Sequence, residues 1–125
     1  MKVIDAGVVV ELLVGGLDPS LIGDEELAAP HLIDSEVPNA LRRLALRGAL
    51  AETSATQAMN GFLRIVLQRY PADWLRARMW ALRHNLSAYD ATYVALAEML
   101  GASSLLTTDS GLAGTPGISC RVEVV

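Results

Sequence analysis

The spacing of hydrophobic and polar residues predicts a strand and then a helix at the start of the chain. Residues 2–5 contain a short apolar run that suits a strand, and residues 6–14 repeat apolar side chains at helical spacing. Glycines, an aspartate and a proline between residues 15 and 19 mark a break. The apolar residues 27–30 are expected to form a second strand before the next helix.

The middle of the chain is predicted to contain further helices and one strand. Asp34 or Ser35 is expected to cap a helix that runs to about residue 47. Residues 53–63 suit another helix, and residues 65–70 have the β-branched and aromatic content of a strand. Residues 74–82 then resemble a helix with one apolar side.

The clearest local helix signal lies in the last third of the chain. Ser87, followed three residues later by Asp90, matches a capping box at a helix N-terminus. The predicted helix carries one stripe formed by Tyr89, Tyr93, Leu96 and Leu100. Strands are expected at residues 104–107 and 121–125, and between them residues 109–114 form a turn with one helical turn.

Short strands separated by helices indicate an α/β domain with a mainly parallel sheet between helical layers. The 125 residues are enough to close one hydrophobic core, so we expect a single domain over residues 1–125. No internal repeat, low-complexity tract or interdomain linker is visible in the sequence.

The composition indicates a cytoplasmic protein that contacts a partner. Hydrophobic residues make up 52% of the chain and the mean hydropathy is +0.36, which predicts apolar surface outside the core. No stretch approaches the roughly 20 apolar residues of a membrane span, so no membrane association is expected. Cys120 is the single cysteine, which excludes an internal disulfide and suits a reducing compartment.

The charge balance limits how the protein can bind nucleic acid. The net charge is −4, which argues against broad nonspecific adhesion but permits a local basic strip. Nine of the ten basic residues are arginine, whose planar group suits phosphate. Two pairs share helix faces and are candidates for phosphate contact, although the favoured interpretation is that they are solvated surface arginines: Arg43 with Arg47, and Arg76 with Arg83.

Four acidic residues occupy positions where an active site of a parallel sheet is expected. Asp5 ends the first predicted strand, and Asp109 follows the strand at residues 104–107. Glu36 and Asp90 lie in the first turns of predicted helices. Each acid alone also fits a helix cap or a favourable dipole contact. Together they are expected to converge at the carboxyl ends of the strands.

Such a cluster needs a counter-charge, because two unit charges ~5 Å apart repel by about 3 kcal/mol at an effective dielectric of 20. Oxygen ligands of this kind favour Mg²⁺ or Mn²⁺. Zinc is disfavoured because His31, His84 and Cys120 have no ligand spacing, and both histidines are interpreted as surface or loop residues. Divalent ions held by carboxylates suit phosphodiester hydrolysis.

These residues resemble a known family in order and spacing over nearly the whole chain. The matching segments are Val3-Ile4-Asp5-Ala6, Ser35-Glu36-Val37, Ser87-Ala88-Tyr89-Asp90-Ala91 and Leu106-Thr107-Thr108-Asp109. They resemble VapC-type toxins of the PIN-domain family. The resemblance implies a three-layer α/β/α sandwich, Mg²⁺- or Mn²⁺-dependent endoribonuclease activity on RNA, a homodimer, and inhibition by a VapB-like antitoxin.

Carried over by position, the resemblance assigns Asp5, Glu36, Asp90 and Asp109 to catalysis and metal binding. Thr107 matches a hydroxyl that supports the acids. The chain departs from the family at residue 7, where a glycine stands in place of a small polar residue and removes one supporting hydrogen bond. Ser110 is a candidate replacement hydroxyl, and Trp74 and Trp80 are candidates for partner or dimer contact.

Other classes fit the sequence less well. A phosphoacceptor receiver domain requires a lysine near the last strands, and Lys2 is the only lysine. Nucleotide-binding folds are disfavoured because neither glycine-rich phosphate motif occurs. The remaining alternative is a catalytically silent PIN fold that only binds RNA or a protein, for which four mutually repelling acids bring no advantage.

Overall fold

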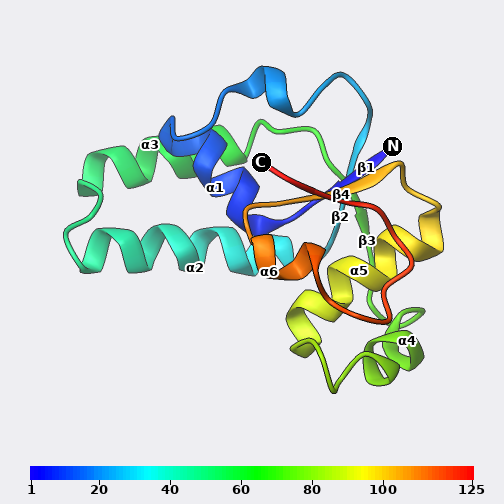
Figure 1. The fold of residues 1–125 in the computed structure, drawn as a ribbon. Coiled ribbons are helices and arrows are strands. Elements are labelled where there is room, and N and C mark those ends of the chain that lie inside the picture. Colours follow the sequence, from blue (N-terminus) through cyan, green and yellow to red (C-terminus); the bar gives the residue numbers. More distant parts are fainter.

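A parallel five-stranded sheet forms the centre of the protein (Figure 1). The strands are β1 (Lys2–Ile4), β2 (Leu27–Pro30), β3 (Gln68–Tyr70), β4 (Ser104–Thr107) and β5 (Val122–Val124). The computed structural model describes residues 1–125. In it the strands follow the order β3-β2-β1-β4-β5, and every neighbouring pair is parallel. The carboxyl ends of all strands therefore lie at one edge of the sheet.

Helices cover both faces of the sheet. One layer contains α1 (Ala6–Val14), α2 (Ile33–Leu46) and α3 (Glu52–Phe62), and the other contains α4 (Arg76–Ala81) and α5 (Ala88–Leu100). Val3 and Leu105 are paired in the sheet and pack in the core cluster of α4 and α5. The next pair, Ile4 and Leu106, packs in the cluster of α1, α2 and α3. The predicted three-layer α/β/α sandwich is thus confirmed.

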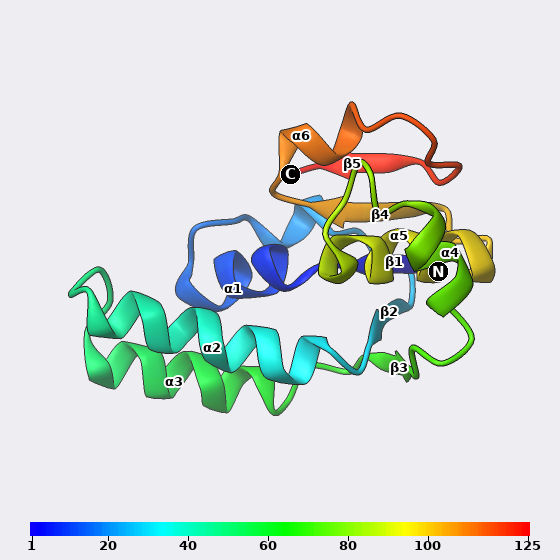
Figure 2. The same ribbon diagram turned by 90° about the horizontal axis from the view of Figure 1, so that it is seen from below.

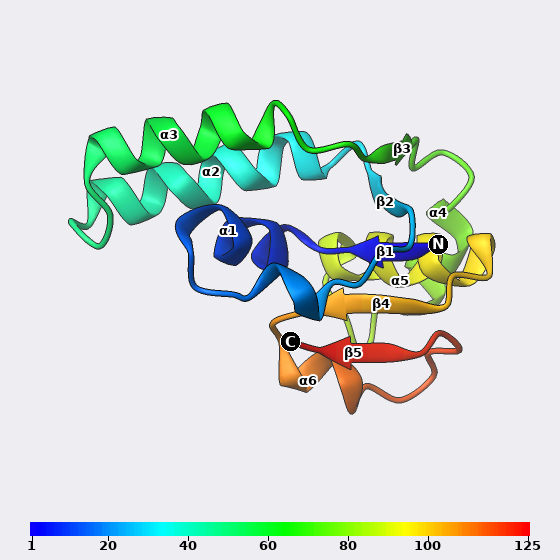
Figure 3. The ribbon, with the colours of Figure 1, turned by 90° about the horizontal axis from the view of Figure 1, so that it is seen from above.

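Helices α2 and α3 lie side by side and extend beyond the sheet (Figures 2 and 3). We call this pair the α2–α3 arm. Its inner end packs against α1, where Val37 and Phe62 are buried. Because Glu36 lies beside Val37 near the start of α2, the packing of the arm also fixes the position of this acid.

Two short helices complete the structure. A 3-10 helix, η1 (Pro19–Leu21), follows α1, and α6 (Ser110–Ala113) follows β4. The helix α6 confirms the single helical turn predicted within residues 109–114. No helix of the protein has both the length and the apolar character that a bilayer crossing requires.

The start of α2 differs from the one predicted from the sequence. The helix begins at Ile33, and its N-cap residue Leu32 makes no side-chain cap hydrogen bond. Asp34 and Ser35 lie inside the first turn instead of capping it. The carboxylate of Asp34 accepts two hydrogen bonds from Arg69 of β3, at 2.7 and 2.8 Å, so a tertiary ion pair replaces the expected cap.

Other predicted helices and strands form, but they begin or end at different residues from those predicted. The strand expected over residues 65–70 forms only at Gln68–Tyr70, and the helix expected over residues 74–82 is α4, Arg76–Ala81. The expected stripe of α5 is also interrupted, because Tyr93 is buried whereas Tyr89, in the first turn, is 63% exposed. Both histidines are exposed, as interpreted from the sequence.

Candidate active site

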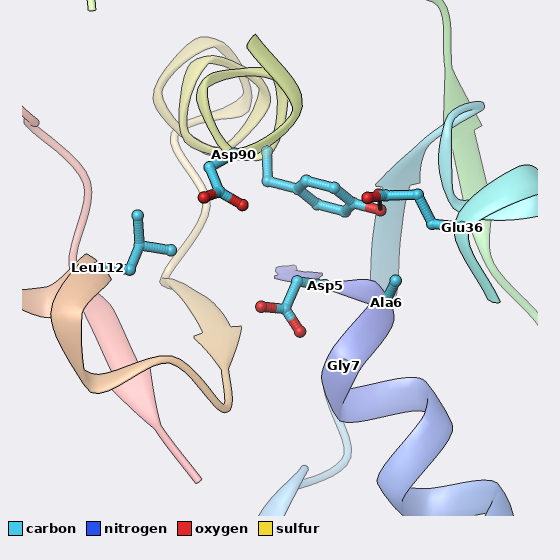
Figure 4. A pocket seen from close by; sticks show the side chains of 7 residues that line it. Asp5, Ala6, Gly7, Glu36, Asp90 and Leu112 are labelled. Atoms are coloured by element: carbon cyan, nitrogen blue, oxygen red, sulfur yellow. Dashed lines mark hydrogen bonds between the residues drawn. The ribbon is translucent and has the colours of Figure 1, made fainter. Parts of the chain in front are cut away.

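Three of the four predicted acids line one pocket at the carboxyl edge of the sheet. The pocket has a volume of about 80 Å³ and is lined by Asp5, Ala6, Gly7, Glu36, Asp90, Tyr93 and Leu112. The carboxylates of Asp5, Glu36 and Asp90 face the space between α1, α2 and α5 (Figure 4). The fold therefore brings together acids that are distant in the sequence.

The pocket lies where the order of the strands reverses. From β1 the sheet continues through β2 and β3 on one side and through β4 and β5 on the other. Open α/β sheets form their binding crevices at this point, outside the carboxyl ends of the strands. Asp5 directly follows β1, and Asp109 is the second residue after β4, so the two acids flank the reversal.

Asp5 is held at the N-terminus of α1. Its Oδ1 accepts a 2.9 Å hydrogen bond from the backbone N–H of Val8, and the residue is the N-cap of the helix. Its own N–H donates to the carbonyl oxygen of Leu106 in β4 at 3.1 Å. Strand pairing and helix capping together fix this partly buried carboxylate.

Glu36 is held by a tyrosine of the opposite helical layer. The hydroxyl of Tyr93, on α5, donates a 2.6 Å hydrogen bond to Glu36 Oε1. Burial first, and then the hydrogen bond and charge of Glu36, raise the pKa of the Tyr93 hydroxyl, which therefore stays protonated and acts as a donor.

Asp90 lies in the first turn of α5, and Ser87 is the N-cap as predicted. The Ser87 Oγ accepts a 3.2 Å hydrogen bond from the Asp90 backbone N–H. Because the serine caps the helix through the backbone, the carboxylate of Asp90 is left to face the pocket.

Asp109 lies beside the pocket and is not part of its lining. Its Oδ1 accepts a 2.8 Å hydrogen bond from the Gly111 N–H, which makes it the N-cap of α6. Its own N–H donates to Thr107 Oγ1 at 3.0 Å. Thr107 is fully buried and also lowers the pKa of Asp5 through a hydrogen bond. Thr107 thus interacts with two of the acids.

Burial and mutual repulsion raise the pKa values of all three lining acids. Burial is the largest cause for each of them. The charges of Asp90 and Asp109 raise the pKa of Asp5 further, and those of Asp90 and Asp5 raise the pKa of Glu36. The charge of Asp109 likewise raises the pKa of Asp90. All four predicted acids therefore interact electrostatically.

No basic residue neutralises this cluster. The ion pairs of the protein involve other acids: Glu25, Asp34, Glu98 and Glu123. In this conformation no three acidic, histidine or cysteine side chains are close enough together to hold one metal ion. The donor set still suits a hard divalent cation, since it consists of carboxylate oxygens with raised pKa values and no compensating charge.

Two further residues that shape the site were not predicted from the sequence. Tyr93 was assigned to a helical stripe, although its spacing of three from Asp90 already placed both on one face of α5. The other is Thr108. A Cβ added at Gly7 would lie 2.7 Å from Thr108 Oγ1 and 3.5 Å from Asp5 Oδ1. The hydroxyl of Thr108, the residue that follows β4, therefore occupies the space beside Asp5 that a side chain at residue 7 would fill.

The fold and the pocket define a general class: an α/β/α protein with an acidic pocket at the point where the strand order of a parallel sheet reverses. The family model that describes the PIN domain matches residues 2–118. The chain belongs to the PIN domain family, and its similarity over the full length places it among the VapC members.

Two relatives and one solved structure illustrate this similarity. Ribonuclease VapC9 of Mycobacterium tuberculosis is 43% identical, over 100% of this chain and 98% of that protein. Ribonuclease VapC1 of the same species is 41% identical, over 98% of this chain and 96% of that protein. The crystal structure of PAE2754 from Pyrobaculum aerophilum has a TM-score of 0.71 at 27% identity, and covers 98% of this chain and 83% of that one.

Proposed function

We propose that this protein is an endoribonuclease that requires Mg²⁺ or Mn²⁺ and acts as the toxin of a toxin–antitoxin pair. The observation that carries the proposal is the pocket of Asp5, Glu36 and Asp90, in which mutually repelling carboxylates have no basic partner. Support also comes from relatives at 43% and 41% identity that are named ribonucleases.

Asp5, Asp90 and Asp109 are the residues that would hold a first metal ion, and Glu36 would hold a second ion or the attacking water. When bound, a divalent ion lowers the pKa of water and stabilises negative charge on the phosphate. The protein contributes the orientation of the oxygens: the Val8 N–H fixes Asp5, and Thr107 fixes the backbone of Asp109.

Glu36 is suited to take a proton from the attacking water. Its Oε1 is occupied by the Tyr93 hydroxyl, while Oε2 has no hydrogen-bond partner and remains available. Burial raises its pKa, which brings the carboxylate closer to the range where a general base is effective.

The test is RNA cleavage by Asp5→Asn and Asp90→Asn variants with Mg²⁺ or Mn²⁺ added. Both variants should keep the wild-type circular dichroism spectrum and lose cleavage, whereas Asp18→Asn, in an exposed loop, should remain active. Cleavage retained by either pocket variant would overturn the assignment. If the wild-type protein binds RNA but cuts none under these conditions, the catalytically silent alternative is correct.

We further propose a homodimer and a VapB-like antitoxin as partners. Large apolar side chains remain exposed, among them Trp74 at 78% and Trp80 at 68%, together with Leu46, Leu63 and Val66 near the α2–α3 arm. Expression of the protein alone should arrest bacterial growth, and co-expression of the antitoxin should restore it. Light scattering of the purified chain tests the homodimer.

A further inference from the structure

A second, larger groove lies next to the acidic pocket. It has a volume of about 620 Å³ and is lined by Leu32, Ser35, Glu36, Asn39, Arg43 and Tyr89. We propose that this groove binds one nucleotide of single-stranded RNA beside the phosphate that is cleaved, with its base against Tyr89 and a phosphate at Arg43. The proposal rests on the ribonuclease function proposed above and specifies how its substrate is held.

The groove and the acidic pocket share a wall. Glu36 lines both cavities. Tyr89 of the groove directly precedes Asp90 of the pocket on the first turn of α5. A ligand bound in the groove therefore lies directly next to the acidic pocket.

Tyr89 provides a flat surface for a base. Its side chain is 63% exposed, although the sequence pattern placed it in the core stripe of α5. Exposed aromatic rings that face a groove are the usual platforms on which single-stranded nucleic acids stack.

The groove wall on α2 changes from acidic to basic away from the pocket. Glu36, Asn39 and Arg43 are spaced by three and four residues, so they follow one another along one face of the helix. Arg43 is exposed and takes part in no ion pair. A free guanidinium two helical turns from Glu36 suits a backbone phosphate that adjoins the cleaved one.

Asn39 lies between the acid and the arginine. Its exposed amide offers both donors and an acceptor, the combination that distinguishes base edges. RNA is read mainly in single strands, by stacking together with hydrogen bonds to base edges. An aromatic ring, an amide and an unpaired arginine in a groove of nucleotide size supply these contacts.

The experiment measures binding of labelled oligo(U), oligo(A) and oligo(C) RNA with EDTA present, so that binding is separated from cleavage. Tyr89→Ala should weaken binding roughly tenfold, and Tyr89→Phe should not. Arg43→Ala should lower the slope of log affinity against log salt by about 0.7. Asn39→Ala should reduce the preference among the three RNAs without changing this slope.

One exposed residue outside the groove is the matched control. Arg42 is the neighbour of Arg43 on α2 and does not line the groove. Arg42→Ala should bind RNA like the wild type. Equal RNA binding by the wild type, Tyr89→Ala and Arg43→Ala would overturn the proposal.

The two proposals can fail separately. If Tyr89→Ala and Arg43→Ala lose RNA binding while the wild type cleaves nothing with Mg²⁺ or Mn²⁺, the groove is an RNA site and the catalytic proposal is wrong. If both variants keep full RNA affinity but no longer hold a co-expressed antitoxin, the groove is a protein site and the RNA proposal is wrong.

Discussion

The hydroxyl of Tyr93 donates a 2.6 Å hydrogen bond to Glu36 Oε1 across 57 positions of the sequence. The bond joins α5 to α2, which pack on opposite faces of the sheet. It holds an acid of the pocket with a donor whose raised pKa keeps it protonated. The tyrosine is therefore a positioning residue for Glu36.

Replacement of this tyrosine should change the pH dependence of cleavage. The hydrogen bond from Tyr93 lowers the pKa of Glu36 and so opposes the effect of burial. In Tyr93→Phe the pKa of Glu36 rises further, and the acidic limb of the pH–rate profile should move to higher pH. Tyr70→Phe, at a partly buried tyrosine of β3, is the control. An unchanged profile in Tyr93→Phe would contradict the role of the bond.

Asp5→Asn should stabilise the metal-free protein at neutral pH. Burial, and then the charges of Asp90 and Asp109, raise the pKa of Asp5 in the folded state. Folding then binds a proton, so this contribution to stability is present at acidic pH and is lost as the pH rises through the raised pKa. Asparagine retains the N-cap without the charge.

Thermal unfolding in EDTA at several pH values checks this prediction. The stability of Asp5→Asn should match that of the wild type at acidic pH and exceed it at neutral pH. Added Mg²⁺ should stabilise the wild type and have little effect on the variant. Asp18→Asn is the control, and its effect on stability should have the opposite sign. Hydrogen bonds from Ser20 lower the pKa of Asp18, so the Asp18 carboxylate contributes stability at neutral pH that is lost at acidic pH.

Gly7→Ala should destabilise the protein by about 1 kcal/mol, because the new Cβ would meet Thr108 Oγ1 at 2.7 Å. In a Thr108→Ala background the obstructing oxygen is absent, and Gly7→Ala should instead stabilise by roughly 0.5–1 kcal/mol through its helix propensity. Urea unfolding of the four proteins of this double-mutant cycle measures the coupling. Additive effects would show that Thr108 does not restrict residue 7.

Glu98→Ala should destabilise the fold by about 2 kcal/mol. Glu98 accepts hydrogen bonds from Arg78 at 2.7 and 3.0 Å and from the Ser119 N–H at 2.7 Å, so it links α5 to α4 and to the segment before β5. The more exposed ion pair of Asp34 with Arg69 is the comparison, and Asp34→Ala should cost less than 1 kcal/mol, as surface pairs do by rough estimate.

The pH dependence of Glu98→Ala provides a second readout. Hydrogen bonds from Arg78, and then from Ser119, lower the pKa of Glu98 in the folded state. Its contribution is present above the ordinary carboxylate pKa and is lost as the pH falls through the lowered one. The difference in unfolding free energy between wild type and variant should shrink on acidification. A constant difference would contradict the ion-pair explanation.

The sequence was sufficient to predict the architecture and the edge of the sheet at which the acids lie, because both follow from local patterns. A carboxylate directly after a buried strand must lie at the carboxyl edge of a parallel sheet, which placed Asp5. Ser87 likewise capped its helix as predicted, because a cap depends on the backbone of the next three residues.

The remaining details depend on contacts between distant segments. Asp34 pairs with Arg69, 35 positions away, and nothing near Asp34 indicates that this ion pair replaces a helix cap. The exposure of Tyr89 and the approach of Thr108 to Gly7 depend in the same way on how α5 and β4 meet the rest of the fold. Periodicity describes one helix at a time and cannot contain such information.

The outermost strands of the sheet, β3 and β5, have three residues each. A strand from another molecule would find only a few free backbone groups on which to extend the sheet, so edge-to-edge aggregation is disfavoured. This protection matters for a chain that is 52% hydrophobic. Contacts with another molecule are thereby left to the side-chain surfaces of the helices, where they can be selective and reversible.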